Sequence, residues 1–154
     1  MKHVKKSVLL WYSPREMYEL VTAVDDYPMF LPWCAKAEVV ERHEDGMIAR
    51  LTLAKGGLRH AFTTRNQHRN GQEVRVALVD GPFSELEGTW LFQPVSRGGA
   101  TRDADAPACR IEFDLRYAFA NLALETLISP VFDRVANTLV DSFVQRAEQV
   151  HGPR

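Results

Sequence analysis

The sequence lacks a long uninterrupted apolar run. Near the N-terminus, His3, Lys5 and Lys6 alternate with Val4 and Val8, so no signal-peptide core is present. No later stretch approaches the roughly 20 apolar residues that a membrane-spanning helix needs. We therefore expect a cytoplasmic protein, with peripheral contact to the inner membrane as the alternative.

Neither positive nor negative charge is in excess. The chain has 19 Lys and Arg against 20 Asp and Glu, a formal net charge of -1. Because no run of like charge and no basic helix is present, the sequence gives no sign of a surface that follows nucleic-acid phosphates, and we expect no DNA partner. A basic patch assembled by folding is left open.

Cysteine is scarce, and recognisable catalytic motifs are missing. Cys34 and Cys109 lie far apart and in no metal-ligand spacing, so we expect two small buried or half-buried side chains and no disulfide framework. The 5 histidines are dispersed, and no nucleophile elbow or phosphate-cradling glycine loop occurs. We expect no metal, no redox cofactor and no catalytic residue, which favours a non-catalytic binding protein over an enzyme.

The most informative segment is the apolar stretch DDYPMFLPWC from Asp25 to Cys34. Pro28 and Pro32 fix their own φ angles and push the preceding residues out of helical geometry, so we expect a stiff corner and no helix. A cluster of large apolar side chains on such a corner either fills the local core or borders a cavity or membrane. The sequence alone leaves these two alternatives open.

Periodicity along the rest of the chain predicts an α+β fold in one domain, residues 1–150, with a tail at 151–154. A strand over 1–12 precedes a short helix opened by Ser13, Pro14 and Glu16. A meander of antiparallel strands follows, in which Asn70-Gly71 is a strong hairpin signal. The segment 97–107, rich in Gly and Asp, has almost nothing to bury, and we expect it to be a mobile solvated loop.

The last two predicted strands, 84–94 and 108–119, each carry one apolar, aromatic face. Trp90 and Phe92 share a face in the first strand, and Phe113 and Tyr117 share one in the second, while acidic residues hold the opposite faces. Glu85 and Glu87 therefore favour a solvated surface role over acid–base catalysis. A long amphipathic helix over 121–150 would cover the dry face of a curved sheet of six to seven strands, a helix-grip arrangement.

Several of these segments carry a family resemblance. The corner DDYPMFLPWC, the strands GPFSELEGTWLF and RIEFDLRYAFAN, and the helix over 131–147 together resemble the coenzyme Q-binding branch of the START-like superfamily, also described as polyketide cyclase or dehydrase-like. That family includes members of the bacterial ribosome-association toxin type. The resemblance covers nearly the whole chain and implies the helix-grip fold.

The resemblance also implies a function. It points to binding of ubiquinone or a related isoprenoid lipid between the sheet and the C-terminal helix, in support of respiratory electron transport, by a carrier or chaperone. The open alternatives are a toxin-like protein that binds the large ribosomal subunit, and a polyketide cyclase or dehydrase-type enzyme. No cofactor beyond the bound lipid is implied.

Two sets of residues are candidates for the ligand and membrane contacts. A quinone headgroup would take one or two hydrogen-bond donors, for which Tyr117, Trp90, Thr64 and His60 are candidates. The predicted portal to the membrane, beside the N-terminal end of the long helix, consists of Met29, Phe30, Leu31 and Trp33. The predicted cavity lining is Trp33, Leu53, Phe62, Val76, Leu78, Phe83, Leu86, Trp90, Tyr117, Leu124, Ile128 and Phe132.

Overall fold

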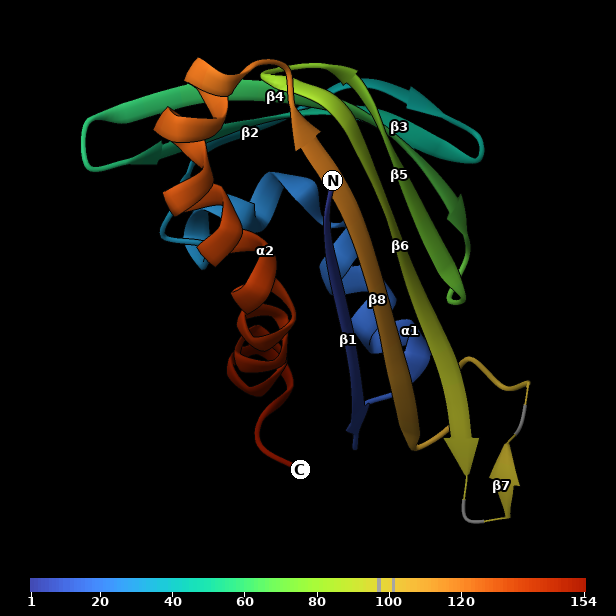
Figure 1. Cartoon of the computed structure of the whole chain (residues 1–154). Coiled ribbons are helices and arrows are strands. Elements are labelled where there is room, and N and C mark those ends of the chain that lie inside the picture. Colours follow the sequence, from blue (N-terminus) through green and yellow to red (C-terminus); the bar gives the residue numbers. More distant parts are fainter. Residues whose placement is uncertain (97, 101) are drawn as a thin grey trace.

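The structure is a computed structural model that describes residues 1–96, 98–100 and 102–154. One curved antiparallel sheet wraps around the C-terminal helix (Figure 1). The helices are α1 (Pro14–Thr22), the 3-10 helix η1 (Val24–Met29) and α2 (Leu122–His151). The strands are β1 (Lys2–Leu10), β2 (Cys34–His43), β3 (Gly46–Lys55), β4 (Leu58–Arg69), β5 (Glu73–Asp80), β6 (Phe83–Ser96), β7 (Gly99–Ala100) and β8 (Ala108–Phe119).

The strand order is β1-β8-β6-β5-β4-β3-β2, with the two-residue β7 paired to the end of β6. This arrangement confirms the predicted α+β helix-grip architecture. All neighbouring strands are antiparallel, and the longest register runs from Phe83 opposite Phe119 to Val95 opposite Ala108. Because β6 and β8 alternate in phase, their aromatic side chains all reach the concave face of the sheet.

Two tight turns hold the central strands in place. Gly71, in the predicted Asn70-Gly71 turn, has a φ of 72°, and Gly56 and Gly57 between β3 and β4 have φ values of 59° and 86°. These left-handed conformations suit glycine because it has no Cβ. The β3–β4 hairpin therefore ends in a two-residue turn, which fixes the register that places Lys55 opposite Leu58.

Helix α1 begins at a complete capping box, as the sequence predicts. The Ser13 hydroxyl accepts a hydrogen bond from the Glu16 backbone at 3.0 Å, and the Glu16 carboxylate accepts one from the Ser13 backbone at 2.8 Å. Met17 and Val21 on the inner side of the helix are buried. Helix α1 thereby closes the end of the concave face that α2 leaves uncovered.

The expectation of a corner without helix is wrong for its first part. Residues Val24–Met29 form the 3-10 helix η1, which contains Pro28. The tighter turn avoids much of the clash that proline makes inside an α-helix, because each hydrogen bond spans one residue fewer. From Phe30 onward the chain is irregular until β2 begins at Cys34.

The segment 97–107 is more ordered than its composition suggests, although Arg97 and Thr101 lie outside the described residues. Gly99 and Ala100 pair with β6, and the Ala104 carbonyl accepts a hydrogen bond from the Arg15 backbone at 2.9 Å. Asp105 also forms an ion pair with Arg15 at 2.8 Å. Ala106 is buried, so the expectation of a solvated loop with almost nothing to bury is wrong for this part.

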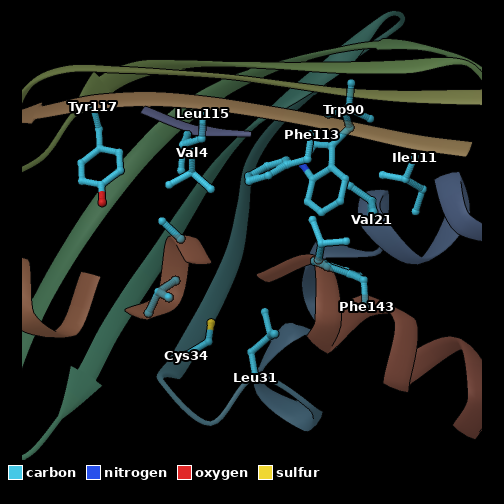
Figure 2. Packing of buried hydrophobic residues seen from close by; sticks show 14 of the residues in the cluster. Val4, Val21, Leu31, Cys34, Trp90, Ile111, Phe113, Leu115, Tyr117 and Phe143 are labelled. Carbon is cyan, nitrogen blue, oxygen red and sulfur yellow. The ribbon is translucent and has the colours of Figure 1, made fainter. Parts of the chain in front are cut away.

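Helix α2 crosses the concave face of the sheet, and Figure 2 shows sheet side chains such as Leu115, Phe113 and Trp90 pointing from the strands toward the helices. The last residues do not form a free tail. His151 belongs to α2, the Gly152 carbonyl accepts a hydrogen bond from the Tyr12 hydroxyl at 2.7 Å, and Arg154 pairs with Glu16 at 2.7 Å.

Candidate ligand cavity and its outer groove

A small apolar cavity of about 100 Å³ lies between the sheet and α2. Strands β3, β4, β5, β6 and β8 form one wall, and η1 and α2 form the other. The inward alternation of the strands places apolar side chains here, and Trp90 meets Phe113 with ring centroids 4.5 Å apart. The volume is smaller than the several hundred Å³ that a bound lipid needs, because aromatic rings from both walls fill the space.

One polar pair interrupts this apolar lining. Thr64 and Asn66 both point inward from β4, and the Thr64 hydroxyl donates a hydrogen bond to the Asn66 Oδ1 at 2.8 Å. Among the described residues, no side chain or backbone group pairs with the Asn66 amide nitrogen. The cavity therefore offers the Asn66 amide NH2 group as a hydrogen-bond donor toward a carbonyl-bearing ligand.

A second, larger space lies outside the cavity and is called the outer groove here. Its volume is about 960 Å³, and it runs between the β3–β4 hairpin and the part of α2 from Leu127 to Ser142. In Figure 1 the β3–β4 turn extends past the orange N-terminal part of α2. The outer groove is lined by Pro32, Trp33, residues 55–60, and the α2 residues Leu127, Pro130, Val131, Arg134, Val135, Thr138 and Ser142.

Trp33 and Val135 line both the cavity and the outer groove. Trp33 is only 9% exposed, and its backbone carbonyl accepts a hydrogen bond from Ala54 of β3 at 2.8 Å. Any passage between the cavity and the outer groove would run beside Trp33 and Val135.

The predicted cavity residues divide into two groups. Trp33, Phe62, Val76, Leu86, Trp90 and Phe132 line the cavity. Leu53, Leu78, Phe83, Leu124, Ile128 and Tyr117 do not, since they pack elsewhere in the core or against it. Alternation along a strand identifies the inward face but does not show which inward side chains border the gap.

Several cavity residues are absent from the predicted lining. Val24 and Tyr27 come from η1, whose helical turn the proline pattern did not reveal. Phe113 and Leu115 were recognisable from alternation along β8, and Leu139 and Phe143 from the apolar stripe of the helix. A stricter use of periodicity on β3 would also have pointed to Ala49 and Leu51.

The four residues of the predicted portal differ in exposure. Met29 is 68% exposed, but Leu31 is only 1% exposed and belongs to the core. The Phe30 ring packs on Phe143 with centroids 5.3 Å apart, in the second half of α2 and away from its N-terminal end. Phe30, Leu31 and Trp33 of this segment therefore pack in or against the core, with Phe30 on Phe143.

The candidate headgroup donors are similarly divided. Thr64 and Trp90 line the cavity, while His60 lies in the outer groove. The Tyr117 hydroxyl is already engaged, because it donates to Asp133 of α2 at 2.5 Å. The other Asp133 oxygen lies 2.5 Å from the Lys2 Nζ.

This Lys2–Asp133–Tyr117 cluster fastens α2 to β1 and β8. Burial, followed by the hydrogen bond to Asp133, raises the pKa of Tyr117 well above its ordinary value, so the hydroxyl stays protonated and continues to donate. Figure 2 shows the Tyr117 hydroxyl pointing away from the sheet. The cluster is suited to holding the helix in place.

The cysteines are unsuited to nucleophilic chemistry. Both are free and buried, and burial raises the pKa of Cys34 to about 11 and that of Cys109 to about 12. Glu85 and Glu87 lie exposed on the convex face, as predicted. Within the described part of the chain, no group of three His, Cys, Asp or Glu side chains is placed to hold a metal ion.

No helix in the described residues combines the length and apolar character needed to cross a membrane.

The sequence and the fold can be compared with those of known proteins. Residues 10–144 match the family described as polyketide cyclase / dehydrase and lipid transport. The chain belongs to this family. Solved structures with the same fold include a START superfamily protein from Mycobacterium smegmatis, with a TM-score of 0.75 at 18% identity over 96% of this chain and 98% of that one.

Two relatives in sequence carry different functional names. The ribosome association toxin RatA of Pseudomonas aeruginosa is 41% identical over 97% of this chain and 98% of its own. The mitochondrial coenzyme Q-binding protein COQ10 homolog B of Xenopus laevis is 27% identical over 96% of this chain and 58% of its own. The aromatase/cyclase Zhui of Streptomyces shares the fold, with a TM-score of 0.77 at 15% identity over 99% of both chains.

Proposed function

We propose that this protein binds a hydrophobic ligand between the sheet and α2, and that the ligand is ubiquinone or a related isoprenoid lipid. The observation that carries this proposal is the apolar cavity under α2, which shares Trp33 and Val135 with the outer groove. The chain would act as a quinone carrier or chaperone that supports respiratory electron transport. The coenzyme Q-binding relative supports this ligand class.

The two spaces suit the two parts of such a molecule. A quinone ring that enters the cavity would meet the Thr64 and Asn66 pair, where the Asn66 amide can donate to a ring carbonyl. The isoprenoid tail would follow past Trp33 into the outer groove, whose floor includes Val131 and Val135. Each methylene that leaves water contributes about 0.8 kcal/mol, so affinity would come mainly from the tail.

The first test is organic extraction and mass spectrometry of the protein purified from its native host. Near-stoichiometric ubiquinone, lost in a folded Trp90→Ala variant, is the expected result. In vitro, a short-tailed ubiquinone should quench tryptophan fluorescence, and Asn66→Leu should weaken its binding about fivefold, as expected when one hydrogen bond is lost. Gln67→Leu, at an exposed position on the same strand, is the matched control. No uptake of any isoprenoid by the folded wild type would overturn the proposal.

We propose ribosome association as a second candidate function, because relatives named for it align over nearly their full length at 36 to 41% identity. In this role the chain would bind the large ribosomal subunit and oppose subunit joining. Cosedimentation of the purified protein with isolated subunits tests this directly. Binding to the large subunit with fewer joined ribosomes is expected, whereas no binding at low salt would overturn this candidate.

A further inference from the structure

Basic side chains gather along the outer groove. Lys55 and Arg59 come from the β3–β4 hairpin, and Arg134 comes from α2, while His60 adds a titratable ring. The lining contains no Asp or Glu, although acidic residues outnumber basic ones in the whole chain by 20 to 19. Folding therefore concentrates positive charge here from a chain with no excess of it.

These three basic side chains are not neutralised within the protein. Lys55, Arg59 and Arg134 are all exposed, and no described acidic side chain forms an ion pair with any of them. By contrast, Lys2, Arg15, Arg75 and Arg154 each pair with a carboxylate. The three charges are available to an anionic partner.

Apolar side chains lie directly beside these charges. Leu127, which is 56% exposed, lies one turn before Val131 on the α2 face that continues through Arg134. Leu58 at the hairpin tip is half-buried opposite them. Apolar groups flanked by Lys and Arg are the combination that favours the boundary between acyl chains and anionic headgroups.

We propose that the rim of the outer groove, formed by Lys55, Arg59, Arg134 and Leu127, docks on an anionic phospholipid bilayer. The Lys and Arg side chains contact lipid phosphates, and Leu127 inserts at the level of the upper acyl chains. The groove's use as a ligand entrance rests on the proposed function, since it would let a tail pass from the bilayer to Trp33. Docking itself depends only on the rim.

A bilayer fits this surface better than an RNA backbone. An RNA-binding groove combines a track of positive charge with polar or stacking contacts along its length. Here Leu58, Leu127, Pro130 and Val131 lie between the cations, whereas the groove's aromatic residue, Trp33, is only 9% exposed and its polar residues are His60, Thr138 and Ser142. The proline corner is a weaker docking candidate, because Leu31 and Trp33 are buried and only Met29 is strongly exposed.

The experiment is vesicle cosedimentation with phosphatidylcholine alone and with added phosphatidylglycerol. The test variant is Arg59→Gln/Arg134→Gln, and the matched control is Lys6→Gln/Arg65→Gln, which removes the same charge from exposed positions outside the groove. We expect the wild type to prefer anionic vesicles. The test variant should lose about 25-fold in partitioning, at about fivefold for each charge, while the control changes by about twofold or less.

Further measurements with salt, a Leu127 variant and RNA distinguish bilayer docking from other kinds of binding. High salt should weaken binding to anionic vesicles, because the Debye length falls to about 3 Å at 1 M. Leu127→Gln should lower binding even with both arginines present. Equal wild-type binding to neutral and anionic vesicles, or an equal loss in the control, would overturn the inference. So would vesicle binding that is unchanged in the test variant while its binding to polyuridylate RNA is lost.

The same proteins are titrated with short-tailed ubiquinone. If quinone binding persists in the wild type but vesicle docking is absent, the docking inference fails and the proposed function stands. If the wild type docks through this rim but takes up no isoprenoid, the proposed function fails and the docking surface is supported.

Discussion

The two sides of helix α2 differ in how they meet the sheet. Toward β8 and β1, Phe132 packs in an aromatic cluster, and Asp133 joins Tyr117 and Lys2. Toward the β3–β4 hairpin, the next residue, Arg134, faces the outer groove. We call these the fastened side and the open side of α2.

The comparison shows where a ligand can enter. Opening the fastened side would break aromatic ring contacts and leave the buried Tyr117 hydroxyl without its acceptor, which is costly. Toward the hairpin, Trp33 and Val135 border both the cavity and the outer groove. We therefore expect a ligand to reach the cavity through the outer groove.

The largest expected effect is on the fastened side. The Phe132 ring lies 4.8 Å from that of Tyr117 and 4.9 Å from that of Phe83 between centroids. Phe132→Ala should lower the free energy of unfolding by about 3–5 kcal/mol, because it leaves a cavity among aromatic rings. Leu127→Ala on the open side should change it by about 0.5 kcal/mol or less. Urea denaturation measures both, and similar losses would erase the distinction between the sides.

The polar cluster gives the next largest effect. Asp133→Ala leaves the buried Tyr117 hydroxyl without its acceptor and Lys2 without its partner, so we expect a loss of about 1–3 kcal/mol in urea. Asp141→Ala, at an exposed position of the same helix, is the control. Adding Tyr117→Phe to Asp133→Ala should recover part of the loss. Additive losses in the double variant would show that the hydroxyl and carboxylate are not coupled.

A smaller effect concerns the C-terminal end of α2. Burial alone would raise the pKa of Glu16, but the hydrogen bonds from Arg154 and the Ser13 backbone, with the nearby His151, lower it below its ordinary value. The folded protein therefore favours the ionised carboxylate. Its stabilising contribution is present above the unfolded-state pKa of about 4.3 and is lost as the pH falls through the lower folded-state pKa.

Glu16→Gln should reduce this acid dependence. In thermal unfolding between neutral pH and about pH 3, the variant should lose less stability than the wild type, by no more than about 1 kcal/mol because these groups are partly exposed. Glu19→Gln, on the exposed side of α1, should behave as the wild type. If Glu16→Gln and the wild type lost the same stability between neutral pH and about pH 3, the ion pairs would not hold α2 to α1.

The sequence predicted the strands well and the gaps between them poorly. Period-two alternation in β6 and β8 and the Asn70-Gly71 turn reflect local backbone geometry, which neighbouring residues determine. The inward position of Phe30 depends on its packing against Phe143, a contact across more than one hundred residues. The basic groove similarly combines residues from a hairpin and a helix that are far apart in the chain.

The two free cysteines provide the smallest expected effect, because Cys34 lies next to the open side of α2 and Cys109 lies in a part of the core away from the groove. Cys34 follows Trp33 at the open side, whereas Cys109 lies on β8 and is 0% exposed. The pKa values of about 11 for Cys34 and about 12 for Cys109 alone make the Cys34 thiolate roughly tenfold more abundant. In single-thiol variants, Cys109→Ser and Cys34→Ser, native iodoacetamide should therefore alkylate Cys34 at least about threefold faster, because the more abundant thiolate is also the less nucleophilic one. Opening of the groove would increase this ratio, and Trp33→Ala should increase it further without changing Cys109. A Cys109 that reacts as fast as Cys34 would mean that the open side of α2 is no more accessible than the core between β1 and β6.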